Sequence, residues 1–111
     1  MIVRIHTGDD GESHFHELTA DEFAEIANDV GPGDITVGQR PAGWWQDYHT
    51  APRHQYVVFM SGGAEIEVAS GDKRQFGPGD VLVAEDLTGH GHIIRNTGEE
   101  PRVSLAVPLA D

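Results

Sequence analysis

Two histidine-bearing segments on either side of the chain's centre contain the residues best suited to chemistry. The first carries His49 and His54, and the second carries His90 and His92. Imidazole exchanges protons near neutral pH, and its neutral nitrogens are common metal ligands. Short apolar runs and glycine turns separate the two segments. We expect the fold to bring these segments together around one pocket.

Three side chains from these segments are expected to line that pocket: His49, Gln55 and His92. On one straight strand His49 and Gln55 would lie about 20 Å apart, too far to reach a common ligand. Pro52 lies between them, and proline belongs at strand ends and bends. We therefore predict a chain reversal near Pro52 that turns both side chains toward one centre.

Neighbouring residues provide candidate proton carriers and supporting groups. His90 and Tyr56 are the candidates for carrying protons during a reaction. Asp47 shares a strand face with His49, so we expect its carboxylate to orient the ring. His54 adjoins Gln55 and is expected to point away from the pocket.

A cation and two adjacent aromatic residues complete the candidate pocket. Arg53 is one of few cations in the chain, and it is expected to pair with Asp47 rather than to anchor an anionic ligand. Trp44 and Trp45 are neighbours on a predicted strand, so they must face opposite ways. Core or dimer contacts are the commoner role for such residues, and Trp45 is our candidate for the surroundings of the pocket.

Composition limits the class of protein and its partners. A chain of 111 residues fits one domain. The formal net charge of −12 disfavours nucleic acid and anionic membranes, and it fits either ordinary solubility or a saline habitat. The absence of Cys excludes disulfides and Cys–zinc sites. With neither a signal peptide pattern nor a long apolar run, a cytoplasmic location is expected.

The hydrophobic pattern predicts short strands at Ile2 to His6 and Ser13 to Leu18, then one short helix and further strands. Thr19 to Glu22 form a capping-box pattern that starts a helix over about 20–30. Its narrow apolar stripe indicates that it packs outside a larger body. Short apolar runs separated by Gly and Pro turns from 34 to 108 are typical of a β-sandwich or closed barrel. We predict a single all-β domain over 1–111.

The first histidine segment resembles the first motif of the cupin family. That motif is Gly, five residues, His-x-His, three or four residues, Glu, six residues, Gly. Gly43 and His49 match its opening, and Gln55 and Gly62 match the spacing of its close. Ala51 replaces the second histidine, and Gln55 replaces the glutamate.

The second histidine segment resembles the second cupin motif. Gly89, His92 and Asn96 have the spacing of that motif's end, and Gly79 lies in its opening turn. Two extra residues in the middle put Leu87 where the motif has proline. Together the two resemblances cover residues 43 to 96.

The resemblance implies a jelly-roll β-barrel, antiparallel and often homodimeric, with a divalent metal in its pocket. Carried over to this chain, the implied ligands are His49, Gln55 and His92. The implied metal is Fe, Ni, Mn or Zn, which the sequence does not distinguish. An amide oxygen is a weaker ligand than a carboxylate, so the metal would be held less tightly than in a site with Glu.

Three functions follow as hypotheses. The first is a metal-dependent oxygenase, isomerase or lyase acting on a small polar metabolite. The second is a metal-free cupin in which His49 and His92 act as acid and base. The third is a non-catalytic cupin that binds or senses a small molecule. In each case we expect a homodimer formed through an exposed edge strand.

Overall fold

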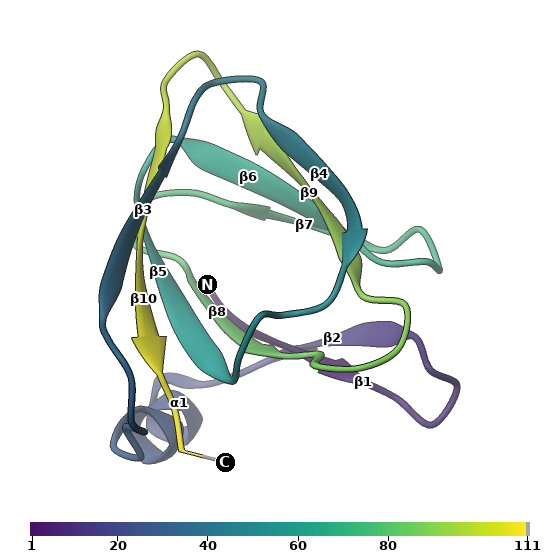
Figure 1. Cartoon of the computed structure of the whole chain (residues 1–111), viewed down its shortest axis with the longest axis vertical. Helices are drawn as coiled ribbons and strands as arrows, with labels where there is room; N and C mark the ends of the chain where they lie inside the picture. The colour runs from purple at the N-terminus through teal and green to yellow at the C-terminus, as the bar shows by residue number, and fades with distance from the viewer. Residues whose placement is uncertain (111) are drawn as a thin grey trace.

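The computed structural model describes residues 1–110 as ten strands in two sheets with one short helix (Figure 1). The larger sheet contains, in spatial order, β2 (Ser13–Glu17), β1 (Ile2–Thr7), β8 (Val81–Glu85), β5 (Gln55–Ser61), β10 (Arg102–Pro108) and β3 (Thr36–Arg40). The smaller sheet contains β4 (Trp45–His49), β9 (His92–Thr97), β6 (Gly63–Glu67) and β7 (Lys73–Phe76).

Both sheets are built almost entirely from antiparallel pairs. The exception is the parallel pairing of β1 with β8. The all-β class predicted from the strand pattern is confirmed. Within residues 1–110 no strand pairing joins the two sheets, so the structure shows a two-sheet arrangement and not a closed barrel.

The hydrophobic core lies between the facing sides of the two sheets. Phe59 of β5 and Phe76 of β7 stack with ring centroids 5.1 Å apart. Ile5 of β1 and Ile66 of β6 are fully buried in the same cluster. Because side chains alternate along a strand, each of these strands contributes one face to this core.

The helix α1 (Ala20–Ala27) begins as predicted and ends earlier than expected. The Thr19 hydroxyl accepts from the Glu22 amide at 3.1 Å, and Glu22 Oε1 accepts from the Thr19 amide at 2.9 Å. Asn28 caps its other end. None of its residues is buried, and Phe23 packs edge-on against Tyr56 at 5.1 Å. The helix therefore covers the outside of the larger sheet, as expected.

The chain reverses direction at the predicted place. His49 ends β4 in the smaller sheet, and Gln55 begins β5 in the larger one. Pro52 lies in the connection between them, where its missing N–H costs no ladder hydrogen bond. This connection crosses from one sheet to the other and positions the site described below. Within the described residues, no helix has the length and apolarity needed to cross a membrane.

Candidate functional site

A cavity of about 600 Å³ lies between the two sheets, with walls contributed by both. His49, Gln55 and His92 all line it. They come from β4, β5 and β9, so the connection through Pro52 and the pairing of β4 with β9 bring them together. This volume is in the range of pockets that hold small organic molecules.

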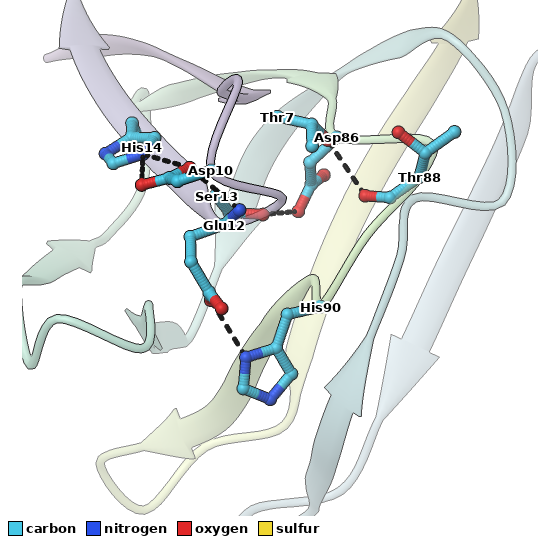
Figure 2. A network of polar contacts seen from close by, with 8 residues as sticks. All are labelled: Thr7, Asp10, Glu12, Ser13, His14, Asp86, Thr88 and His90. Carbon is cyan, nitrogen blue, oxygen red and sulfur yellow. Dashed lines mark hydrogen bonds and ion pairs between the residues drawn. The ribbon is translucent and has the colours of Figure 1, made fainter.

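His92 is oriented by a buried carboxylate that we did not identify in the sequence. Asp86 is fully buried, and its Oδ2 lies 2.6 Å from His92 Nδ1. The same oxygen accepts a hydrogen bond of 2.7 Å from Ser13 Oγ (Figure 2). Because a carboxylate accepts, the neutral form of His92 carries its proton on Nδ1 and has its lone pair on Nε2. The signal for Asp86 was its place directly after β8, where it and Glu85 follow the apolar run of that strand.

His49 lies beside His92, with ring centroids 4.5 Å apart and planes at 58°. Its Nδ1 donates to the backbone carbonyl of Asp47 at 2.9 Å, which leaves Nε2 free. Burial lowers the pKa of His49, and the nearby His92 lowers it further, against the opposing effects of the Asp47 carbonyl and Asp86. At neutral pH His49 is therefore a neutral imidazole with an available lone pair.

The expected roles of Asp47 and Arg53 differ from those in the structure. The Asp47 carboxylate accepts from the Tyr48 amide, so Asp47 orients His49 through its backbone and not through its side chain. Arg53 does not pair with Asp47. Its Nε donates to Gln55 Oε1 at 2.8 Å, and its Nη2 donates to the Asp34 carbonyl at 2.9 Å.

The two candidate proton carriers lie outside the cavity wall. His90 stacks on Tyr48 with centroids 3.9 Å apart, and its Nδ1 lies 2.9 Å from Glu12 Oε2 (Figure 2). Tyr56 packs under the helix against Phe23. Tyr56 lies between Gln55 and Val57, which line the cavity, so side-chain alternation turns it outward. His90 lies in the loop before β9, between two glycines with positive φ, so strand alternation does not extend to it.

Outside the cavity, His54 lies as expected beside Gln55. Its Nδ1 is 3.1 Å from the Ala110 carbonyl. Its Nε2 lies within ion-pair distance of Glu85 Oε2, at 2.9 Å, without a directed hydrogen bond. His54 is therefore held by contacts of its own at the outer side of the larger sheet.

Of the two tryptophans, Trp44 lines the cavity and Trp45 does not. Trp45 is 58% exposed, so the side chain chosen from the sequence points away from the cavity. The guanidinium carbons of Arg40 and Arg102 lie 5.3 and 5.6 Å from the Trp44 ring centroid. Both arginines line the cavity, and we did not identify either from the sequence.

Arg102 is held by neutral partners. Its Nε donates to Asn96 Oδ1 at 2.8 Å, and its Nη1 donates to Ser104 Oγ at 3.2 Å. Burial lowers the pKa of Arg102 from its usual value, and the positive charge of Arg40 lowers it further. Asn96, the end of the second motif, also donates to the Pro41 carbonyl at 2.9 Å, so it links Arg102 to the turn before Trp44.

The rest of the cavity wall is mostly apolar, and none of the residues lining it is Asp or Glu. Its apolar lining includes Val57, Phe59, Ile66, Leu82, Ala84 and Ile94. In a chain of net charge −12 this is an unusual distribution, because no Asp or Glu of residues 1–110 lines this cavity.

The donors present do not fit the divalent metal that the sequence motifs imply. Gln55 Oε1, the expected third ligand, already accepts from the Arg53 guanidinium. What remains is the pair of neutral imidazoles of His49 and His92, with no carboxylate in the cavity wall. Among residues 1–110 no three His, Cys, Asp or Glu side chains are grouped as a metal site. Iron, nickel, manganese and zinc favour at least three protein donors.

Comparison with known proteins places this chain by its fold. It is similar to the conserved SPY1581 protein of unknown function from Streptococcus pyogenes, with a TM-score of 0.51 and 22% identity. The match covers 69% of this chain and 64% of that chain, and at this identity the likeness concerns the fold alone. No protein-family model matches the sequence, and neither does any curated protein.

Proposed function

We propose that this protein is a small cupin-type enzyme that moves protons within a small organic molecule, with His92 and His49 acting without a metal. The cupin assignment is supported by the spacing of residues 43 to 96 and by the two-sheet fold. It is also supported by the meeting of His49 and His92, one from each motif, at a single cavity.

The observation that carries the proposal is the buried Asp86–His92 hydrogen bond at the cavity wall. When His92 Nε2 takes a proton, the ring becomes an imidazolium, and the carboxylate 2.6 Å from Nδ1 stabilises that charge. Ser13 donates to the same carboxylate oxygen and keeps it directed at the ring. This is the arrangement of a general base held by a positioning residue.

His49 acts as the partner of His92 in this proposal. Its lowered pKa keeps Nε2 unprotonated at neutral pH, so Nε2 accepts a hydrogen bond from a substrate hydroxyl or takes a proton itself. A proton removed from one substrate atom by His92 returns to another atom of the same molecule. The protein ends each cycle unchanged. Isomerisation, in which one C–H bond breaks and another forms in the same molecule, is the reaction class that needs only this transfer.

The experiment is a deuterium-incorporation screen of small metabolites in D₂O with chelator-treated protein. Any molecule that loses and regains a proton at carbon becomes labelled, whatever the net reaction, and mass spectrometry detects the label. We expect labelling of at least one metabolite. His92→Asn should slow it by about 100-fold or more, the usual contribution of a general base.

His90→Asn is the matched control, because His90 lies close by in the chain but outside the cavity wall. It should leave the labelling rate unchanged. A protein that labels nothing in the screen, or that labels only after Fe, Ni, Mn or Zn is added, contradicts the metal-free proposal. If His92→Asn kept its activity, His92 would not be the general base, and the proposal would be wrong.

We also propose that the protein is a homodimer formed through β3. Within the described residues β3 is an edge strand paired with β10 only. Val37 on this strand is 66% exposed, and Ile35 just before it is 60% exposed. An edge strand with exposed apolar side chains pairs readily with a second copy of itself.

A further inference from the structure

The six arginines of this chain differ in their partners, and Arg53 is held by the Gln55 side chain and the Asp34 carbonyl. Arg4, Arg74 and Arg95 lie away from the cavity, and each makes an ion pair with Asp or Glu. Arg40 and Arg102 line the cavity, and within residues 1–110 neither makes an ion pair with a carboxylate. Carboxylates outnumber Lys and Arg by nineteen to seven in this chain, yet the wall around Arg40 and Arg102 contains none.

Arg40 and Arg102 are also direct neighbours across two paired strands. They lie opposite each other in the antiparallel pairing of β3 with β10. Like charges directly opposite in a sheet destabilise the pair. Burial and Arg40 already lower the pKa of Arg102. An anion between the two guanidiniums would relieve this repulsion and supply the missing counter-charge.

We propose that Arg40 and Arg102 bind the carboxylate or phosphate group of the molecule that occupies the cavity. That this molecule is the substrate rests on the proposed function. The anion site itself does not. The sequence resemblance points to the histidine end of the cavity and does not involve either arginine. Asn96 and Ser104 hold the Arg102 guanidinium in place before the anion binds.

The cavity also indicates what is attached to the anionic group. Trp44, next to both arginines, precedes β4, and His49 ends that strand. At the rise of a strand this separation is roughly 16 Å between Cα atoms, and the side chains at both ends shorten it. The same cavity is lined by apolar side chains such as Phe59, Leu82 and Ile94. The fitting molecule is therefore elongated, with an anionic end, an apolar middle and the reacting atoms near the histidines.

The test uses Trp44 as its own reporter of binding. Trp45→Phe removes the other tryptophan, which is exposed and outside the cavity wall, so the remaining emission comes from Trp44. The probes are acids matched with their uncharged amides: phenylacetate, 3-phenylpropionate and hexanoate. Phenyl phosphate with phenol forms a fourth pair that distinguishes phosphate from carboxylate. In the Trp45→Phe protein we expect at least one acid or phosphate to bind about tenfold or more tightly than its uncharged partner.

Arginine variants made in the Trp45→Phe protein test whether Arg40 and Arg102 cause the tighter binding of the acids. Arg40→Gln should reduce the preference to about threefold or less, and so should Arg102→Gln. Arg40 is exposed and makes one bond to a neighbouring carbonyl, so its variant keeps the test valid if Arg102→Gln does not fold. Arg74→Gln, at an exposed ion pair on β7, is the control and should keep the full preference.

Each outcome decides the inference. If every uncharged probe binds as tightly as its acid, or if Arg40→Gln leaves the preference intact, the anion site is wrong. The proton-transfer proposal would then still stand on deuterium labelling of a neutral molecule. Conversely, selective acid binding that survives in His92→Asn, without labelling of any metabolite, supports the anion site and removes only the catalytic proposal.

Discussion

At the scale of single residues, the two histidines of the cavity differ in what holds Nδ1. His92 donates to a buried carboxylate, and His49 donates to a backbone carbonyl. Both keep Nε2 free, yet only Asp86 offers a full negative charge to a protonated ring. The two imidazoles lie together but are suited to different steps of one proton transfer.

The pKa of His49 leads to a pH dependence of stability. Burial lowers this pKa from 6.5 in the unfolded chain, so the folded protein binds fewer protons than the unfolded one just below that value. The contribution of His49 to the unfolding free energy is fully present above pH 6.5, and it is lost as the pH falls toward the pKa of His49 in the folded protein. We expect the unfolding free energy of wild type, measured in urea between about pH 5 and 8, to fall on acidification.

His49→Gln should flatten that dependence in the same pH window. His16→Gln, on the exposed end of β2, is the control and should follow the wild-type curve. A His49→Gln curve as steep as that of wild type would show that burial does not depress protonation of His49.

At the scale of elements, the site depends on close contact between the end of β4 and the start of β9. His49 and His92 are direct partners in this pairing. Gly91 allows the approach, because a Cβ on it would lie 2.0 Å from the His49 carbonyl oxygen. Its φ of +82° also lies in the left-handed region that favours glycine.

Replacing Gly91 should therefore cost much more than replacing a glycine with the same backbone angle in open space. Gly98 has φ of +79°, and a Cβ added to it would meet nothing within 4 Å, so Gly98→Ala should cost about 1 kcal/mol. Gly91→Ala adds the clash with His49 and should cost about 3 kcal/mol or more. Chemical denaturation of both variants measures the difference. Equal losses would mean that β4 and β9 can separate freely at this point.

At the scale of the whole molecule, charge is distributed unevenly. The chain carries −12 overall, and the cavity wall contains two arginines and two histidines without a carboxylate. The acidic exterior slows the approach of anions, whereas the cationic interior favours them once inside. An anionic ligand therefore binds only if its attraction to the arginines inside the cavity exceeds its repulsion by the acidic surface.

The proposed dimer is tested at the same scale. Val37→Lys places a charge on the exposed edge strand β3 and should raise the dimer dissociation constant by about tenfold or more. Leu87→Lys, at an exposed apolar residue in the loop after β8, is the control and should leave it unchanged. Sedimentation velocity over a concentration series measures both. A wild-type protein that stays monomeric at high concentration contradicts the dimer.

The sequence alone was sufficient for the elements and for part of the site. Alternating apolar residues and Gly or Pro turns predicted strands close to all ten in the structure, and the capping box predicted the start of the helix. The proline between His49 and Gln55 predicted the reversal that brings them to one cavity. These features are local, because side-chain alternation and proline geometry act over a few residues.

The tertiary structure alone decided what surrounds those residues. Ser13 meets Asp86 across 73 positions of the chain, and Arg40 meets Arg102 only because β3 pairs with β10. Strand periodicity shows which side chains share a face but not which strands become neighbours or in what register. The positioning carboxylate and the paired arginines therefore depend on long-range pairing, which no spacing within one segment encodes.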